Sequence, residues 1–333
     1  MIIKWNNKLF DNYFERLVSK LEWLPSTYTN GAIRYFEQRS IDTNKDFENC
    51  SFIYLLDNDE PVACFIGVKI VKEAKINLCA YEPPCIILVD DNSFTKTQSK
   101  FFLLEIEKII KDVDGTIFYK DFLPDGSLSI LSKYLLSKGA LSTPSFSMFI
   151  DLNNSERELK SNIRKSYKSL ISWGIRELTP KIFDVSNISW EIMNDFRLLH
   201  IKESGKETMS ELSWKKRFEA VKRNEAFIIL GYYRTKLVTA GYFPTSTTHC
   251  YYGSSASRRD LFDKPLFHAI LWMAILHAKK IGCSWFEVGD QIYLSYVKEN
   301  SLSMKEINIS KFKAGFGGKI RVFLDLELIM KMG

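Results

Sequence analysis

Two stretches of the chain share one pattern of apolar runs and polar turns. Residues 52–67 form two apolar runs on either side of the polar turn 57–60, which predicts a β-hairpin. Residues 227–242, which start 175 positions later, show the same pattern. Each predicted hairpin precedes a segment with apolar residues at helical spacing and then a short apolar strand. The helices are expected at 102–111 and 265–280, and the strands at 116–119 and 284–288.

The two halves also end on nearly the same strand sequence. Residues 149–152 read Phe-Ile-Asp-Leu and residues 323–326 read Phe-Leu-Asp-Leu, 174 positions apart. With offsets of 175 for the hairpins and about 167 for the helices, this order favours a duplicated α/β unit. The alternative is a chance match, because the order hairpin, helix, strand is common in α/β proteins. A polar turn at 151–155 predicts a boundary, which gives domains at 1–150 and 151–333.

The composition is that of an ordinary globular protein long enough for two domains. Of its 333 residues, 46% are hydrophobic and 26% are charged, and the 24 Phe, 15 Tyr and 7 Trp can fill two cores. The net charge of +6 comes from 46 Lys and Arg against 40 Asp and Glu. This mild excess is compatible with a phosphate-bearing partner, and it includes no basic tail.

Cysteines, histidines and apolar runs give no sign of a metal site or a membrane anchor. The six Cys include no Cys-x-x-Cys pair and the four His no His-x-x-x-His, so no metal is predicted and the thiols are expected to be reduced. The N-terminal segment lacks the apolar core of a signal peptide, and the longest apolar run, 266–278, is too short to span a bilayer. The sequence therefore predicts a cytoplasmic protein.

Residues 155–174 predict a basic amphipathic helix. Its apolar face is formed by Leu159, Ile163, Tyr167, Leu170 and Ile171. Its positive charge comes from Arg157, Lys160, Arg164, Lys165 and Lys168. Such a helix can bind phosphates or nucleic acid, but a charged face that is merely solvated has the same pattern.

A second candidate segment is the loop of small residues after the expected strand at 249–252. Arg258, Arg259 and Lys264 lie in it, and Asp263 is placed to cap the second predicted helix. A strand, a loop of small residues and a helix N-terminus can together form an anion site. The loop lacks the glycine spacing of a phosphate-binding loop, so a structural turn is the alternative.

The third candidate segment, 309–321, is rich in glycine and basic residues. It contains Gly315, Gly317 and Gly318 together with Lys311, Lys313, Lys319 and Arg321. Glycines allow a ligand to approach the backbone closely, whereas the alternative is a twisted β-bulge before the last strand. The sequence has no serine–histidine–acid order, nucleophile elbow or metal–carboxylate pattern. An enzyme with this sequence is therefore expected to act by positioning an activated donor beside an acceptor amine.

Taken together, these segments resemble the Fem family, the GNAT-type aminoacyltransferases and related N-acyltransferases of bacterial envelope biosynthesis. The resemblance covers residues 159–326 and depends on the order and spacing of seven motifs. These are Ile163-Arg-Lys-Ser-Tyr-Lys, Phe227-Ile-Ile-Leu-Gly, Leu237-Val-Thr-Ala-Gly, Tyr251-Tyr-Gly-Ser-Ser-Ala, Ala278-Lys-Lys-Ile-Gly-Cys, Phe286-Glu-Val-Gly-Asp and Phe312-Lys-Ala-Gly-Phe-Gly. The last one, with the form Phe-Lys-x-x-Phe-Gly, is the most specific.

The resemblance implies an α/β fold with mixed sheets, built as two tandem GNAT-like domains with the acceptor cleft between them. It also implies transfer of an aminoacyl group from aminoacyl-tRNA, or of an acyl group from acyl-CoA, to an amine, with no tightly bound cofactor. Lys313 matches the family's lysine, which is expected to stabilise a donor phosphate or the developing oxyanion, and Phe312 is expected to pack beside it. Tyr251 and Tyr252 match the strand that lines the acceptor cleft.

The same reading assigns roles to the other site residues. Arg164 and Lys168 fall on the family's basic helix and are assigned to the acceptor. Donor phosphates are assigned to Arg258, Arg259, Lys264, Gly315 and Gly317. Glu287 and Asp290 end a strand that leads toward the expected cleft, and both carboxylates are candidates to accept the proton of the amine. Asp290 is taken as the catalytic one of the two. Transfer of that proton to the substrate itself is an equally open alternative.

Two departures from the family bear on the acceptor. The long coiled-coil insertion of the peptidoglycan enzymes is missing, and Glu287-Val-Gly-Asp replaces the usual Asp-x-Gly-Gly. The acceptor is therefore expected to be either a peptidoglycan peptide or an amino sugar of a surface polysaccharide, on a nucleotide-linked or lipid-linked precursor, with peripheral membrane contact in the lipid case. The alternatives of another class are a non-catalytic scaffold that binds tRNA or other nucleic acid, and an inactive GNAT-like subunit. The sequence has no signal for the oligomeric state.

Overall fold

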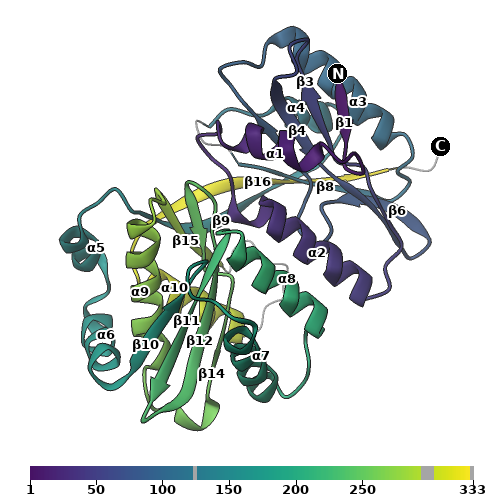
Figure 1. Ribbon diagram of the computed structural model, residues 1–333. Helices are drawn as coiled ribbons and strands as arrows, with labels where there is room; N and C mark the ends of the chain where they lie inside the picture. The colour runs from purple at the N-terminus through teal and green to yellow at the C-terminus, as the bar shows by residue number, and fades with distance from the viewer. Residues whose placement is uncertain (123–125, 294–303, 331–333) are drawn as a thin grey trace. The chain divides into compact units, whose positions relative to one another are not determined.

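The computed structural model describes residues 1–122, 126–293 and 304–330 (Figure 1). The chain forms two compact units. Unit 1 consists of Met1–Leu24, Arg39–Ser145 and Val322–Gly333, and unit 2 consists of Pro25–Gln38 and Phe146–Arg321. The division predicted at residue 150 differs from these units in three segments, because 25–38 and 146–150 belong to unit 2 and the C-terminal segment belongs to unit 1.

Unit 1 contains two sets of paired strands. The first, in the order β1-β3-β4-β7, is antiparallel throughout and consists of β1 (Ile2–Lys4), β3 (Phe52–Leu55), β4 (Pro61–Ile66) and β7 (Ile86–Val89). The second has the order β16-β8-β6-β5-β2, with β16 (Lys319–Ile329), β8 (Thr116–Asp121), β6 (Lys75–Cys79), β5 (Val68–Lys72) and β2 (Phe47–Asn49). The helices are α1 (Phe10–Val18), α3 (Lys96–Ile110) and α4 (Ile130–Ser137).

Apolar side chains of α3 and α4 form the core of unit 1 against these strands. Phe102 of α3 packs on Phe52 of β3, with ring centroids 5.2 Å apart, and Leu135 of α4 belongs to the same cluster. A capping box starts α3, since Thr95 and Gln98 exchange hydrogen bonds between side chain and backbone. The helix therefore begins six residues before the predicted segment.

Unit 2 also contains two sets of paired strands. One has the order β10-β11-β12-β14, with β10 (Thr179–Phe183), β11 (Ala226–Tyr233), β12 (Lys236–Pro244) and β14 (Ser254–Ser257). The other has the order β13-β15-β9, with β13 (His249–Tyr251), β15 (Trp285–Asp290) and β9 (Leu141–Asp151). The helices are α2 (Asn30–Asp42), α5 (Glu156–Asn162), α6 (Lys165–Glu177), α7 (Trp190–Ser204), α8 (Glu211–Lys222), α9 (Leu266–Lys280) and α10 (Met304–Ala314), with short turns η1 (Ser26–Tyr28) and η2 (Arg259–Leu261).

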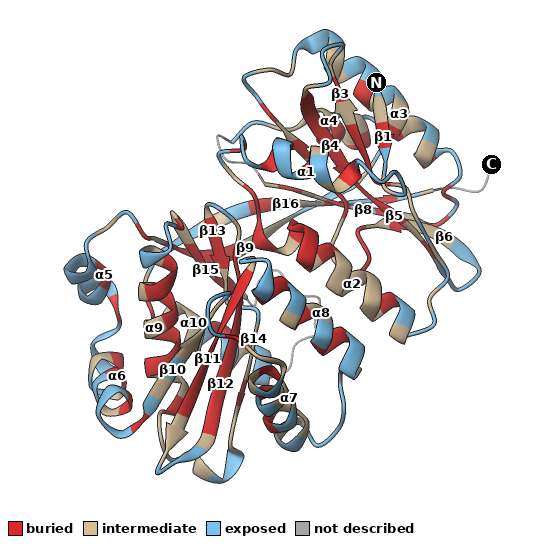
Figure 2. Cartoon of the chain, viewed as in Figure 1, coloured by how far each residue is buried: buried red, intermediate tan, exposed pale blue. Residues whose placement is uncertain are grey.

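Helices cover both faces of the β10-β11-β12-β14 sheet (Figure 1). Alternate residues of β11 point to opposite faces, as the period of two in a strand requires. Phe227 and Ile229 pack in the cluster that includes α6 and α9, whereas Ile228 and Leu230 pack in the cluster that includes α7 and α8. Burial is therefore concentrated in β11, β12 and α9 (Figure 2).

The two units repeat the same order of elements. In each, an antiparallel four-stranded set is followed by a helix, a strand, a second helix and a last strand. The predicted hairpins are β3–β4 and β11–β12, the predicted helices lie in α3 and α9, and the predicted strands lie in β8 and β15. The prediction of a duplicated α/β unit with mixed sheets is confirmed.

The last strand of each repeat pairs within the other unit. Ile150 of β9, which ends the first repeat, lies opposite Phe286 of β15 in unit 2. Leu326 of β16, which ends the second repeat, lies opposite Tyr119 of β8 in unit 1. The chain therefore crosses from one unit to the other within β9 and again within β16.

Residues 25–38 are bound to unit 2 by specific polar contacts. The backbone N–H of Ser26 donates to His249 Nδ1 (3.0 Å), and that of Gly31 donates to Glu225 Oε2 (2.5 Å). One turn further on, Arg217 donates to the hydroxyl of Tyr35 (3.1 Å). These contacts complete unit 2 with a segment from the first half of the sequence.

Two predictions of local structure were wrong. The expected helix at 155–174 is broken, because Ile163 and Arg164 have extended backbone angles between α5 and α6. Asp263 does not cap α9, because the N-cap residue of this helix is Pro265. The Asp263 carboxylate instead contacts Lys264 Nζ (2.6 Å). Among the described residues, no helix combines the length and apolar composition that crossing a bilayer requires.

Candidate functional site

The chain that runs from β13 into β14 changes its pairing partner between Tyr252 and Gly253. Tyr251 of β13 pairs in parallel with Glu287 of β15, and the N–H of Tyr252 still donates to the carbonyl of Glu287 (3.0 Å). The next residue, Gly253, donates to the carbonyl of Tyr242 (3.1 Å), and from there β14 follows β12. Tyr251 and Tyr252 therefore lie where the strand leaves β15.

A bulge in β15 lies beside this point. The register between β15 and β9 shifts between Glu287 and Gly289, and Gly289 has a φ of +109°, which strongly favours glycine. A Cβ at Gly289 would overlap the ammonium group of Lys313 on α10. The absence of a side chain at position 289 thus lets the Lys313 amine lie directly against the backbone of the bulge.

Lys313 lies among groups of opposite charge and aromatic rings. Its side chain is half-buried, and this burial lowers the pKa of Lys313, while the carboxylates of Asp290 and Glu287 act in the opposite direction. The amine lies 6.0 Å from the centre of the Tyr252 ring. A cation held in such a partly dry position interacts more strongly with developing negative charge than one in water.

The two tyrosines stay neutral at physiological pH. Burial raises the pKa of Tyr251 far above its usual value, and Glu287 and Asp290 add to the effect. Burial raises the pKa of Tyr252 to about 12, although its hydroxyl pairs with Ser255 Oγ (2.6 Å). The structure therefore brings together Lys313, Tyr251, Tyr252, Glu287 and Asp290, and the roles assigned to them stay predictions.

Two residues that the sequence analysis did not select hold Glu287. Ser147 Oγ donates to Glu287 Oε1 (2.5 Å), and His249 Nε2 lies 3.1 Å from Glu287 Oε2. Ser147 and His249 are 2% and 1% exposed, so both contacts are shielded from solvent. They come from β9 and β13, the strands on either side of β15, and only this pairing brings them to Glu287.

Aromatic side chains fix the helix that carries Lys313. The ring of Phe312 lies 5.2 Å from His268 of α9 and 6.0 Å from Tyr167 of α6. Phe316, just after α10, lies 5.3 Å from Phe312. Phe312 thus anchors α10 on α6 and α9, which sets the direction of its neighbour Lys313.

The glycines after α10 pack against the chain's own residues. A Cβ at Gly315 would overlap the Tyr167 ring, and Gly317, with a φ of +85°, lies against the carbonyl of Asn162. The carbonyl of Gly315 also accepts the N–H of Arg164 (2.9 Å). Close packing therefore explains these glycines, and their predicted contact with the donor stays a prediction.

The basic residues assigned to ligands already have partners within the protein. Arg164 donates to the carbonyl of Lys311 (3.2 Å) and Lys168 to that of Ser161 (3.2 Å). The first contact joins the α5–α6 break to α10, and the second joins α6 to α5. The acceptor contacts predicted for Arg164 and Lys168 stay predictions.

Two basic residues of the predicted anion loop before α9 form ion pairs with neighbouring carboxylates. Arg258 pairs with Asp260, and Lys264 pairs with Asp263 at 2.6 Å. The backbone N–H of Arg259 donates to Glu203 (2.9 Å). Arg258 also lies five residues after Gly253, just beyond β14, which at about 3.3 Å per residue places it about 16 Å along the strand. A phosphate at this loop would compete with carboxylates.

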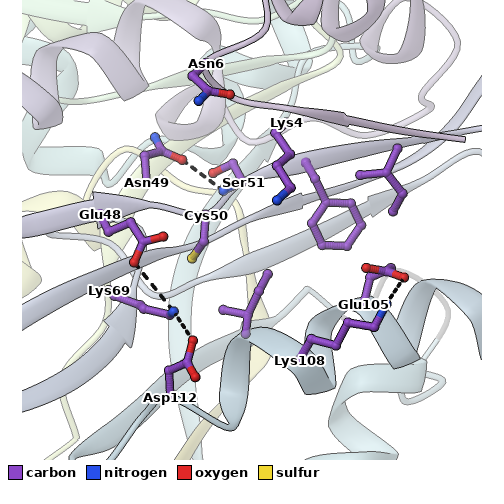
Figure 3. Close-up of a pocket in the computed structure, with 13 residues that line it drawn as sticks. Lys4, Asn6, Glu48, Asn49, Cys50, Ser51, Lys69, Glu105, Lys108 and Asp112 are labelled. Atoms are coloured by element: carbon purple, nitrogen blue, oxygen red, sulfur yellow. Dashed lines mark hydrogen bonds and ion pairs between the residues drawn. The ribbon is translucent and has the colours of Figure 1, made fainter.

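A separate pocket of about 400 Å³ lies in unit 1 (Figure 3). Lys69 faces it but is paired with Glu48 (3.6 Å) and Asp112 (2.6 Å), and Lys108 is paired with Glu105 (2.6 Å). None of the predicted site residues lines this pocket. Within the described ranges, no three His, Cys, Asp or Glu side chains are grouped to bind a metal ion.

Comparison with known proteins gives a clear fold. No protein-family model and no curated protein matches the sequence. Among solved structures, FemX is similar over 98% of this chain and 96% of its own, with a TM-score of 0.68 and 10% identity. L-PGS from Bacillus licheniformis matches over 97% of this chain and 92% of its own, with a TM-score of 0.59 and 11% identity.

A tandem GNAT protein from the clavulanic acid biosynthesis pathway is also similar. It matches 100% of this chain and 99% of its own, with a TM-score of 0.50 and 10% identity. These likenesses extend over nearly the whole chain and agree with the internal repeat. The fold is therefore a tandem GNAT-like fold. Its neighbours include FemX, so the Fem-like fold predicted from the sequence is confirmed.

Proposed function

We propose that this protein is an N-acyltransferase that moves an acyl or aminoacyl group from an activated donor to an amine. The observation that carries the proposal is the position of Lys313, which lies half-buried against the Gly289 bulge where β13–β14 leaves β15. The similarity to FemX, L-PGS and a tandem GNAT protein supports the same class of reaction.

The proposed reaction is a single displacement at a carbonyl. The amine nitrogen attacks the donor carbonyl carbon, and the electron pair of the C=O bond moves to oxygen. Lys313 stabilises this oxyanion, or a phosphate of the donor, as a fixed cation shielded from water. Collapse of the intermediate expels the ribose oxygen of tRNA or the thiolate of coenzyme A, and the proton lost by nitrogen ends on that leaving group.

We favour aminoacyl-tRNA over acyl-CoA as the donor. Arg258 and Lys264, which precede α9, are both paired with neighbouring carboxylates, so a pyrophosphate would have to displace these contacts. The proposed acceptor is an amine on a cell-envelope precursor, either a peptidoglycan peptide or an amino sugar, carried on a nucleotide or on a lipid. A lipid-linked acceptor would bring the protein into peripheral contact with a membrane.

Donor choice is tested by supplying charged tRNA and acyl-CoA thioesters separately with a panel of amino-sugar and peptide amines. Amide products are detected by mass spectrometry, and donor binding is measured across a salt series. Binding of charged tRNA that weakens steeply with salt, together with an amide product, is expected. A product formed only from thioesters would make the protein an acyl-CoA-dependent enzyme. Binding of uncharged tRNA without any product would instead favour the non-catalytic alternative.

A further inference from the structure

We propose that Glu287, rather than Asp290, accepts the proton of the attacking amine, and that His249 and Ser147 are positioning residues for its carboxylate. This inference rests on the proposed transferase function. It concerns a network of described side chains in unit 2 whose members come from three adjacent strands, β13, β15 and β9. Neither His249 nor Ser147 belongs to the motifs of the sequence resemblance.

The backbone of Ser26 sets the hydrogen-bonding role of His249. Because Nδ1 accepts the Ser26 N–H (3.0 Å), that nitrogen carries no hydrogen. The neutral ring therefore carries its hydrogen on Nε2, which lies 3.1 Å from Glu287 Oε2. Stacking of the imidazole on Phe149, with centroids 5.6 Å apart, holds the ring plane. The hydrogen-bearing Nε2 of His249 is thus the ring atom that lies against Glu287 Oε2.

Ser147 supplies a hydrogen-bond donor from the strand on the other side of β15. Its hydroxyl donates to Glu287 Oε1 (2.5 Å), and the His249 ring lies against the other carboxylate oxygen. A carboxylate with both oxygens held in this way keeps its orientation, and the remaining lone pairs stay available to a substrate. The side chain of Glu287 is 15% exposed, which leaves it open to such contact.

The carboxylate that these residues hold is close to Lys313. Glu287 and Asp290 are the two acids that act on the Lys313 amine and on the hydroxyl of Tyr251. Asp290 is exposed at the end of β15. Glu287 is less exposed, and it is held by the buried Ser147 hydroxyl and by its contact with the buried His249 ring. The geometry therefore favours Glu287 as the base.

The proton transfer balances without any further reactant. When the neutral amine attacks, its nitrogen gains positive charge and passes one proton to a Glu287 oxygen. The carboxylic acid so formed then gives this proton to the departing oxygen or sulfur as the intermediate collapses. Ser147 keeps its hydrogen bond to Glu287 and His249 keeps its contact throughout, and neither exchanges a proton with the substrate.

The fold itself does not require an acid at this position. The strand β8 occupies in unit 1 the place that β15 occupies in unit 2, and both have six residues that end in Asp. The third residue is Phe118 in β8 and Glu287 in β15. A shielded polar network costs more to build than an apolar one of similar size. Unit 1 also has a buried polar cluster, in which Asp121 accepts from Ser129 and Ser132, but the third residue of β8 is not an acid. We therefore assign the acid at this position of β15 to catalysis and not to stability.

The test compares matched variants in the transfer assay. Glu287→Gln is expected to lower kcat about 100-fold or more, with donor binding unchanged. Asp290→Asn is expected to lose less, and Glu327→Gln, an exposed acid on β16, serves as the unaffected control. Full kcat in Glu287→Gln, or a larger loss in Asp290→Asn, would overturn the assignment of the base. Absence of product with the wild-type protein would instead refute the proposed function.

The positioning role of His249 is tested with one variant that keeps a side-chain N–H group at this position and one that removes it. His249→Gln retains an N–H near the same place, whereas His249→Phe retains only the packing. We expect His249→Phe to lower kcat about 10-fold more than His249→Gln, with similar KM, and Ser147→Ala to lower kcat while Ser147→Thr restores it. Equal kcat in the two His249 variants would contradict the proposal.

Nitrogen-15 NMR of the wild-type imidazole tests the same geometry without any substrate. The expected state is neutral with hydrogen on Nε2. Hydrogen on Nδ1 would overturn the proposal, even if His249→Phe fails to fold.

Discussion

Units 1 and 2 are built from the same order of elements, yet only one of them has the polar groups described above. After the strands β8 and β15 come the helices α4 and α10, and the residues 132–135 and 310–313 read Ser-Lys-Tyr-Leu and Ser-Lys-Phe-Lys. Leu135 thus stands in unit 1 where Lys313 stands in unit 2, and it is fully buried in the core. The four-residue match therefore pairs a buried leucine in unit 1 with the half-buried Lys313 in unit 2.

The strand before each helix differs in the same way. Gly289 of β15, against which the Lys313 amine lies, corresponds to Lys120 of β8, which pairs with Asp325 (3.0 Å). The next residue is Asp in both strands. In unit 1 this residue, Asp121, is buried and accepts the N–H of Ser129 at the start of α4 (2.9 Å), whereas Asp290 is exposed. Positions that contribute to packing and ion pairs in unit 1 therefore carry the candidate site in unit 2.

The largest expected effect is that of a methyl group at position 289. Gly289→Ala adds a Cβ that overlaps the Lys313 amine and also strains a backbone with a φ of +109°. We expect transfer activity to fall about 100-fold, because a displaced cation no longer faces the reacting carbonyl. Activity is measured as kcat/KM for amide formation.

Gly282→Ala is the control for this variant. Gly282 has a φ of +94° and no atom within 4 Å of the added methyl group, so it carries the backbone strain alone. It should lose stability but keep its activity. Equal losses of activity in the two variants would show that strain, and not the position of Lys313, causes the effect.

The next largest effect concerns stability, and it is produced by placing the lysine of unit 2 at the matching position of unit 1. Leu135→Lys places a charged group in the core of unit 1, where Leu135 is fully buried. We expect the free energy of unfolding to fall by about 3 kcal/mol, because a buried ammonium loses its hydration. Denaturant unfolding measures this change. Leu104→Lys, at a leucine that is 50% exposed on α3, should change stability by about 0.5 kcal/mol or less. A small cost at Leu135 would mean that unit 1 also tolerates a lysine there.

The smallest effect is a dependence on pH in the aromatic cluster that anchors α10. Burial lowers the pKa of His268 to about 4, from about 6.5 in an unfolded chain. As pH falls below 6.5, the unfolded chain binds a proton that the folded protein does not bind until about pH 4, so stability is lost between these values. At pH 5 we expect His268 to account for about 1 kcal/mol of this loss, after allowance for solvent screening.

His268→Phe should remove this part of the pH dependence. The comparison is the difference between the unfolding free energies at pH 7 and pH 5, measured for the wild type and for the variant. A difference that stays the same in both proteins would show that His268 is not the group responsible. Unit 1 has Tyr134 at the position of Phe312 but no such histidine contact among its described ring pairs, so it should contribute nothing similar.

The sequence was enough to predict the repeated elements, because apolar periodicity is local information. It could not show which unit each last strand enters. Phe-Ile-Asp-Leu and Phe-Leu-Asp-Leu present nearly the same apolar face, so either strand can pair with β8 or with β15. The binding of residues 25–38 to unit 2 also depends on distant partners such as His249 and Glu225, which no local pattern reveals.

The same limit explains which candidate site residues the sequence analysis selected. Lys313, Tyr251, Tyr252 and Glu287 were selected because they lie in motifs that resemble a family. Ser147 and His249 lie in ordinary-looking strands, and their role follows only from the pairing of β9 and β13 on either side of β15. One signal was present: a histidine in a strand of otherwise buried residues needs a polar partner, and a search for an acid on a neighbouring strand would have found Glu287.

The most direct test replaces Lys313 with the residue that unit 1 has in its place. Transfer from the preferred donor is measured in a single turnover for the wild type, Lys313→Leu and Lys311→Leu, an exposed lysine two positions earlier on α10. The account predicts that Lys313→Leu folds, and that amide formation falls about 100-fold to 1,000-fold, while Lys311→Leu stays near the wild type. Amide formation at the wild-type rate by Lys313→Leu would contradict the central claim.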